Sequence, residues 1–310
     1  MTGVGAAAAL AVNRRLVDAE TRPPEPDGGR IVHVDACDVH VVEHGPRDAP
    51  PVVLLHGFAG SMRWFDRLWP LLGERRVIMV DLPGHGGSEK PDISYAIADH
   101  AAVVTSVLRD LAVERAEVVG HAMGAAVAAA LAETESGAVE RLVLINEGPD
   151  NTFVSAPLIA RLGFQPVIGE LLHRVVNDGM VRDGYRDAFA EGFDLADGFP
   201  DPDQVVSDFR RMTYSAYKRS WEQEDAYLAE KRLDHRVRDL GLPALVIFGE
   251  RDRFFRAAES AAAFRAIPGV RVEMLPGSGH SPQVEQPEAV AALVADFGGG
   301  AAARSRDGGR

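Results

Sequence analysis

The sequence has little cysteine and no long hydrophobic run. Cys37 is the one cysteine among 310 residues, so no disulfide can form within the chain, and this usage is typical of a reducing compartment. No apolar run approaches the roughly 18 residues that a membrane-spanning helix needs. We therefore predict a cytoplasmic protein without a membrane span.

Basic residues are also in deficit, with 33 Lys and Arg against 46 Asp and Glu and a formal net charge of −13. Such a chain repels polyanions, which excludes nucleic acid as an expected partner. No Gly-x-Gly-x-x-Gly loop follows the first predicted strands and no Walker loop occurs, so we expect no cofactor. His33, Cys37, His40 and His44 match no zinc spacing. We interpret these four as strand-surface residues and expect no metal.

Strand and helix signals alternate along most of the chain. Residues 30–36 and 37–45 alternate polar and apolar positions, which predicts an antiparallel pair. Continuous apolar runs, typical of strands buried on both faces of a parallel sheet, follow at 51–57, 76–84, 116–121, 141–149, 243–252 and 270–280. Helical patterns lie between them at 62–72, 95–112, 123–135, 256–266 and 286–297. We predict the α/β class, with a mostly parallel eight-stranded sheet flanked by helices.

One gap interrupts this alternation between the strands that end near Asn146 and start near Pro243. It is helix-like and rich in aromatic residues, and a structureless loop of that length is improbable in a compact domain. We therefore predict an inserted helical cap over the sheet. The predicted units are an N-terminal helix (4–20) and linker within 1–29, a core of 30–149 and 239–298, a cap of 150–238 and a disordered tail of 299–310. A monomer or homodimer is expected.

Polar residues follow several predicted strands, at the edge where open α/β sheets bind their ligands. His56 and Gly57 end the first apolar run at 51–57, Asp252 ends the run at 243–252, and His280 ends the last. Residues 118–126 read VVGHAMGAA, which has the spacing of the Gly-x-Ser-x-Gly nucleophile elbow but with Ala122 at its centre. The chain order is therefore elbow, acid, histidine.

These ordered motifs resemble the capped members of the α/β-hydrolase fold superfamily over about residues 30–297. The resemblance implies that Ala122 occupies the place of the nucleophile serine, that His280 is the general base and that Asp252 orients it. It also implies an oxyanion hole formed by the backbone N–H groups of Phe58 and Met123. Residues expected to contact substrate are Phe58, Met123, Phe153 and Phe254.

The alanine at the elbow leaves several interpretations open. A methyl group cannot attack a carbonyl, and loss of the triad serine of a serine protease costs about 10⁶ in kcat. Ala122 is either a replacement of a native serine or the mark of a natural non-hydrolytic member, or else the nucleophile lies elsewhere. Ser278 and Ser281 flank the histidine, but neither lies on an elbow.

Other side chains compete for roles in the site. Glu250 and Glu147 are rivals of Asp252 as the acid. We interpret His56 and His85 as scaffolding at loop starts and His121 as a packing residue. In the predicted cap, acidic Glu222, Glu224 and Asp225 fit either an amine-binding site or a solvated helix.

The reaction expected from these features is acyl transfer. Epoxide hydrolases and haloalkane dehalogenases of this fold carry Asp at the elbow and usually Pro where this chain has Ala59. We therefore predict a serine-type hydrolase for an ester, thioester, lactone or similar bond of a medium-to-large apolar small molecule, inactivated by Ala122. The alternatives are a ligand-binding pseudo-hydrolase and a non-covalent acid–base enzyme using His280 and Asp252.

Overall fold

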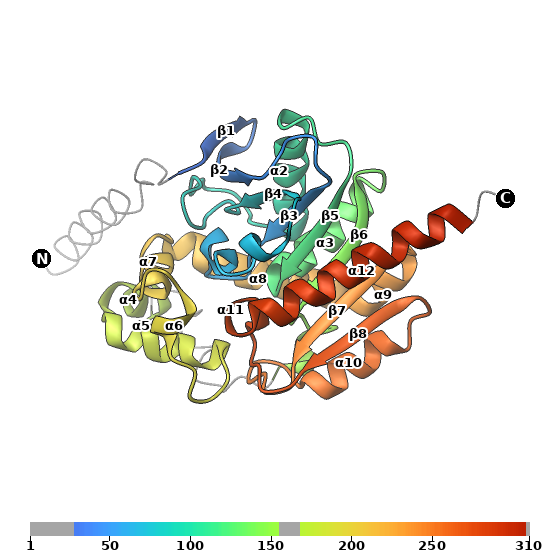
Figure 1. Cartoon of the computed structure of the whole chain (residues 1–310). Helices are drawn as coiled ribbons and strands as arrows, with labels where there is room; N and C mark the ends of the chain where they lie inside the picture. The colour runs from blue at the N-terminus through green and yellow to red at the C-terminus, as the bar shows by residue number, and fades with distance from the viewer. Residues whose placement is uncertain (1–27, 155–167, 308–310) are drawn as a thin grey trace, which may run out of the picture.

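The computed structural model describes residues 28–154 and 168–307 (Figure 1). Within these residues, eight strands form one sheet in the order β1-β2-β4-β3-β5-β6-β7-β8. The strands are β1 (Arg30–Val34), β2 (Cys37–His44), β3 (Pro51–Leu55), β4 (Arg76–Val80), β5 (Ala116–His121), β6 (Val139–Ile145), β7 (Ala244–Gly249) and β8 (Val270–Leu275). β2 pairs antiparallel with β1 and β4, and all other neighbours are parallel. The predicted α/β class and mostly parallel sheet are confirmed.

The continuous apolar runs supply two cores because side chains alternate across a strand. On β3, Val53 and Leu55 belong to one core, whereas Val52 and Leu54 belong to the other. The first core packs against α2 (Ile97–Asp110), α3 (Met123–Thr134), α9 (Leu233–Leu240) and α10 (Ala257–Arg265). The second packs against the 3₁₀ helix η1 (Met62–Phe65) and α12 (Pro287–Asp307). Helices therefore cover both faces.

Two predicted segments differ from the structure. Residues 62–72 do not form one helix but two 3₁₀ turns, η1 and η2 (Trp69–Leu71). Pro70 has no N–H with which to continue an α-helical ladder. The tail predicted to be disordered from residue 299 is helical to Asp307, because α12 continues. No proline interrupts that stretch, and Ala301–Ala303 favour helix. The predicted helix at 4–20 lies outside the described residues.

The predicted insertion between β6 and β7 is helical where the structure describes it. It contains η3 (Asn151–Phe153), α4 (Ile168–Val175), α5 (Asp178–Tyr185), η5 (Arg186–Ala188), α6 (Leu195–Gly198), α7 (Gln204–Arg210), α8 (Tyr214–Glu230) and α9. In Figure 1, α4 to α7 group to one side of the sheet, while α9 lies behind β6 and β7. Leu233 and Val237 of α9 pack in the core with α3. The predicted boundary at residue 238 therefore falls inside a helix of the core layer.

Candidate active site

The elbow is built where β5 turns sharply into α3. Ala122 has φ +48° and ψ −125°, a strained conformation for a residue with a Cβ. The flanking glycines permit the turn because α3 approaches the sheet closely. A Cβ on Gly120 would lie 2.3 Å from the Gly124 carbonyl oxygen, and one on Gly124 would lie 2.2 Å from that of Leu55. The strained position is thus held by packing on both sides.

The predicted base and acid are in contact. His280 Nδ1 lies 3.0 Å from Asp252 Oδ2, and the Asp252 side chain is fully buried. Burial raises the pKa of Asp252, but the His280 ring and other donors outweigh burial and hold that pKa below its usual range. Asp252 is therefore a carboxylate that can orient the imidazole and stabilise an imidazolium.

The loop that carries Asp252 is fixed by further hydrogen bonds. Asp252 Oδ1 accepts from the N–H groups of Phe254 (2.7 Å) and Phe255 (3.1 Å). The Asn146 amide donates to Asp252 Oδ2 at 2.6 Å, and its Oδ1 accepts from Gly249 N at 3.0 Å. Asn146 thus joins the end of β6 to the end of β7. The sequence analysis missed this residue, although its position directly after a buried strand was a signal.

The predicted oxyanion loop follows β3 and rests on a buried polar network. His56 Nε2 accepts from Leu82 N at 3.0 Å, so Nδ1 carries the proton and donates to Gly57 O at 2.8 Å. Burial lowers the pKa of His56, in agreement with a neutral ring. A Cβ on Gly57 would lie 3.1 Å from the Ala122 Cβ. The loop before Phe58 therefore touches the elbow, where Met123 begins α3.

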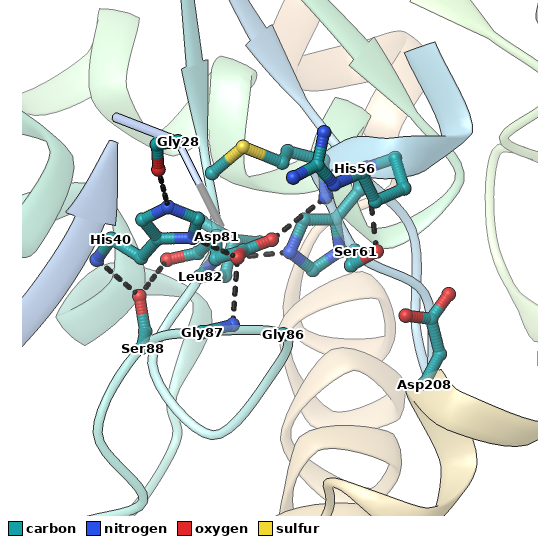
Figure 2. A network of polar contacts seen from close by, with 12 residues as sticks. Gly28, His40, His56, Ser61, Asp81, Leu82, Gly86, Gly87, Ser88 and Asp208 are labelled. Carbon is teal, nitrogen blue, oxygen red and sulfur yellow. Dashed lines mark hydrogen bonds and ion pairs between the residues drawn. The ribbon is translucent and has the colours of Figure 1, made fainter. Parts of the chain in front are cut away.

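Asp81 forms the centre of this network, with its carboxyl between His40 and His56 (Figure 2). It accepts from His40 Nδ1 (2.8 Å), Met62 N (2.7 Å) and Gly87 N (2.7 Å). Burial raises the pKa of Asp81, but the His40 hydrogen bond and its other partners outweigh burial and lower that pKa to about 2. The predicted scaffolding role of His56 agrees with this position. His85 is also buried and its Nδ1 lies 3.0 Å from Pro83 O.

A cavity of about 830 Å³ lies between the sheet and the helices α4, α5, α7 and α8. Ala122, His121 and His280 contribute to its wall from the sheet side. Apolar and aromatic residues form much of the rest: Phe58, Trp64, Val154, Leu172, Val176, Met180, Val181, Tyr185, Phe209, Tyr217, Trp221, Phe254 and Phe255. Its size suits a medium-sized small molecule.

The predicted substrate contacts divide into two groups. Phe58 and Phe254 line the cavity. Met123 is fully buried and is not among the described lining residues, so its side chain is a core residue. Phe153 also lies outside that lining, because its ring packs under the guanidinium groups of Arg232 (5.3 Å) and Arg256 (5.6 Å). The side chains of Met123 and Phe153 thus lie outside the described lining, and their contact with substrate stays a prediction.

The rival residues lie elsewhere or have other partners. Glu250 is exposed, and Glu147 is buried beside Glu224. Ser278 and Ser281 are buried and absent from the described cavity lining. His121 does more than pack, because its Nε2 donates to the His280 carbonyl at 2.9 Å. Burial and the adjacent His280 lower the pKa of His121 to about 3, so the ring is neutral.

Of the four residues considered for a metal, Cys37 and His40 are buried, so these two are not the strand-surface residues that we predicted. His33 Nδ1 lies 2.6 Å from Asp38 Oδ1, His40 contacts Asp81, and His44 stacks on Trp69 at 3.6 Å. Cys37 is buried, and burial raises the pKa of its thiol to about 12. Across residues 28–154 and 168–307, no group of three His, Cys, Asp or Glu side chains is arranged to hold a metal ion.

The sheet, the elbow and the acid–histidine pair define an α/β-hydrolase-fold protein. The chain belongs to the alpha/beta hydrolase family, whose model matches residues 52–293. A Bacillus subtilis protein provisionally named 2-succinyl-6-hydroxy-2,4-cyclohexadiene-1-carboxylate synthase is 27% identical over 277 residues, which are 85% of this chain and 95% of that protein. The carboxylesterase YbfK of the same species is 24% identical over 264 residues, which are 83% of each chain.

Solved structures share this fold. The enol-lactonase from Burkholderia xenovorans LB400 has a TM-score of 0.72 at 23% identity, covering 86% of this chain and 99% of that one. At this identity the likeness shows the fold alone. Among the described residues, the helices include none with the length and hydropathy to cross a membrane.

Proposed function

We propose that this site is that of an acyl hydrolase, for an ester, thioester or lactone of an apolar small molecule, in which Ala122 replaces the nucleophile. The observation that carries the proposal is the retained elbow: Ala122 has φ +48° beside the His280–Asp252 pair. The packing of Gly120 and Gly124 maintains this strained conformation, which an alanine with only a structural role at the cavity wall would not need. A hydroxyl at this position would be displayed by the same strained turn.

The surrounding groups supply the remaining parts of acyl transfer. His280 would accept the proton of a hydroxyl, and Asp252 would stabilise the imidazolium that forms. The N–H groups of Phe58 and Met123 would donate to the oxyanion, and the N-terminus of α3 begins directly after Ala122. With alanine present, the chain binds such substrates but has no hydroxyl with which to form an acyl-enzyme.

The test compares the chain with its Ala122→Ser variant on p-nitrophenyl esters, acyl thioesters and lactones of short and long chains. We expect kcat/KM to rise at least about 10³-fold in the variant, since the other groups are already in place. The control is Ala122→Ser combined with His280→Ala, which should return to the level of the chain itself. A folded Ala122→Ser variant that is silent on all three substrate classes would contradict the proposal.

A second candidate is non-covalent acid–base catalysis by His280, as in a lyase or cyclase. The observation that favours it is that His280 and Asp252 are joined at 3.0 Å in a chain without a serine at the elbow. This candidate requires activity with Ala122 present that is lost in His280→Ala. Activity that appears only in Ala122→Ser excludes it.

A further inference from the structure

Two carboxyl groups meet in the wall of the cavity. Glu147 comes from the loop after β6 and Glu224 from α8, and both line the cavity. Glu147 is 2% exposed and Glu224 is 9% exposed. The two carboxyl groups are close enough that the ionisation of each depends on the other. In the described part of the chain, Glu147 Oε1 has no hydrogen-bond partner.

The pair has no cationic partner in the cavity. Four acidic side chains are among the described lining residues, which include no Lys or Arg. Glu222 is ion-paired with Lys218 at 2.5 Å, and Asp225 accepts a hydrogen bond from Asn151. Glu222 and Asp225 are exposed. Glu147 and Glu224 are therefore the buried acids of the lining, and neither has an ion-pair partner in the described part of the chain.

Burial makes ionisation of this pair costly. It raises the pKa of Glu224 to about 8, and Asp225 adds to the effect. Burial, Glu224 and Asp252 raise the pKa of Glu147 well above its usual range. Because like charges at contact cannot both ionise easily, the pair retains at least one proton at neutral pH. A cation placed beside the pair would remove this penalty.

Aromatic rings lie on the same face of α8 as Glu224. Tyr217, Trp221 and Glu224 are spaced four and three residues apart, which places them along one side of a helix. Phe58 contacts both rings, with centroids 4.9 Å from Tyr217 and 5.6 Å from Trp221. All four residues line the cavity. Aromatic faces beside carboxyl groups are the surroundings that an ammonium ion prefers.

We propose that Glu147 and Glu224, with the rings of Tyr217, Trp221 and Phe58, bind a protonated amine on the substrate. The substrate class is then an amine-bearing apolar acyl compound; this inference rests on the proposed function, because it takes the cavity to be the acyl site. Binding releases one proton: the ammonium replaces the proton shared by the two carboxyl groups, and that proton goes to solvent. No bond of the ligand is made or broken.

The experiment measures binding by calorimetry to the chain with Ala122, on which the ester is not consumed. The probes are butyl ω-aminoalkanoates of short, medium and long acyl chains. Each is paired with the butyl alkanoate in which a methyl group replaces the ammonium. We expect at least one amino ester to bind about tenfold or more tightly than its uncharged partner near neutral pH. Heats in buffers of different ionisation enthalpy should show release of about one proton per ligand.

Variants assign the preference to the pair. Glu147→Gln with Glu224→Gln should remove the preference for the amino ester and leave binding of the uncharged ester unchanged. The matched control is Glu222→Gln, which alters a cavity carboxylate already paired with Lys218 and should keep the preference. Between about pH 6 and pH 9, affinity for the amino ester should rise with pH. The carboxyl pair must lose a proton before it binds the cation, whereas an alkyl ammonium of ordinary pKa keeps its proton over this range.

The outcomes separate the two proposals. Equal binding of charged and uncharged esters overturns the amine site and leaves the acyl site standing. A preference that persists in the double Gln variant, or that occurs without proton release, also overturns it. Failure of both esters to bind the chain overturns the acyl site and the amine site together.

Discussion

At the scale of single residues, Ala122 is a position where the backbone is poorly suited to its side chain. Its φ of +48° with ψ −125° is a region that glycine enters freely and alanine does not. Ala122→Gly should therefore raise the free energy of unfolding by about 1 kcal/mol. The substitution relieves backbone strain in the folded state, and this gain exceeds the cost of making the unfolded chain more flexible. Urea denaturation measures this change.

The control for Ala122→Gly lies three residues away. Ala125→Gly places the same substitution in the regular part of α3, where it should lower stability by about 1 kcal/mol. Equal losses in both variants would mean that Ala122 is not strained.

At the scale of elements, the site depends on how neighbouring strand ends are tied together. Asn146 follows β6. Its side chain contacts Gly249, the last residue of β7, and Asp252 in the loop that follows β7. Its φ of +47° is one that glycine also accepts, so Asn146→Gly removes the amide without straining the backbone. We expect a loss of about 1–3 kcal/mol in stability, because Gly249 N and Asp252 each lose a buried partner.

The same variant tests positioning. Combined with Ala122→Ser, Asn146→Gly should lower kcat more than it raises KM, and it should shift the acidic limb of the pH–rate profile, because Asp252 loses a donor that favours its charged form. A stability loss with an unchanged pH profile would make Asn146 a structural residue only.

At the scale of the whole molecule, buried histidines and buried glutamates have opposite effects on how stability changes with pH. Burial lowers the pKa of His100 to about 4 and that of His121 to about 3, so these rings favour folding above their unfolded pKa near 6.5 and weaken it as pH falls. Glu147 and Glu224 have raised pKa values, so their contribution is present below the unfolded pKa of 4.5 and is lost as pH rises through about 8.

The free energy of unfolding should therefore be greatest between about pH 4.5 and pH 6.5, where the two effects oppose each other, and should decline on the alkaline side because of the glutamate pair, on the scale of about 1.4 kcal/mol per unit of pH per proton. Glu147→Gln with Glu224→Gln should flatten the alkaline decline and leave the acidic one, which the histidines cause. Urea denaturation on both sides of this pH range measures both limbs. An alkaline decline unchanged in the double variant would contradict this assignment.

The sequence alone determined the α/β class, the succession of strands along the chain and which residues follow their ends, but not the order of the strands in the sheet. These features depend on local periodicity, since a continuous apolar run must be buried on both faces wherever the strand lies. Ala122, Asp252 and His280 were identifiable for the same reason: the ends of parallel strands meet at one edge of a sheet. Pro70 interrupted a predicted helix because one missing N–H outweighed a helical pattern.

Only the tertiary structure decided which side chains meet across that edge and beneath the helical insertion. The pairing of Glu147 with Glu224, the tie from Asn146 to Asp252 and the placement of Phe153 against two arginines join residues far apart in the chain. No period or motif encodes such contacts, because they follow from how α8 and the strand-end loops pack together. The chemical groups of the candidate site could thus be predicted from the sequence. The charge state and the partners of Glu147 and Glu224, in contrast, were set by packing.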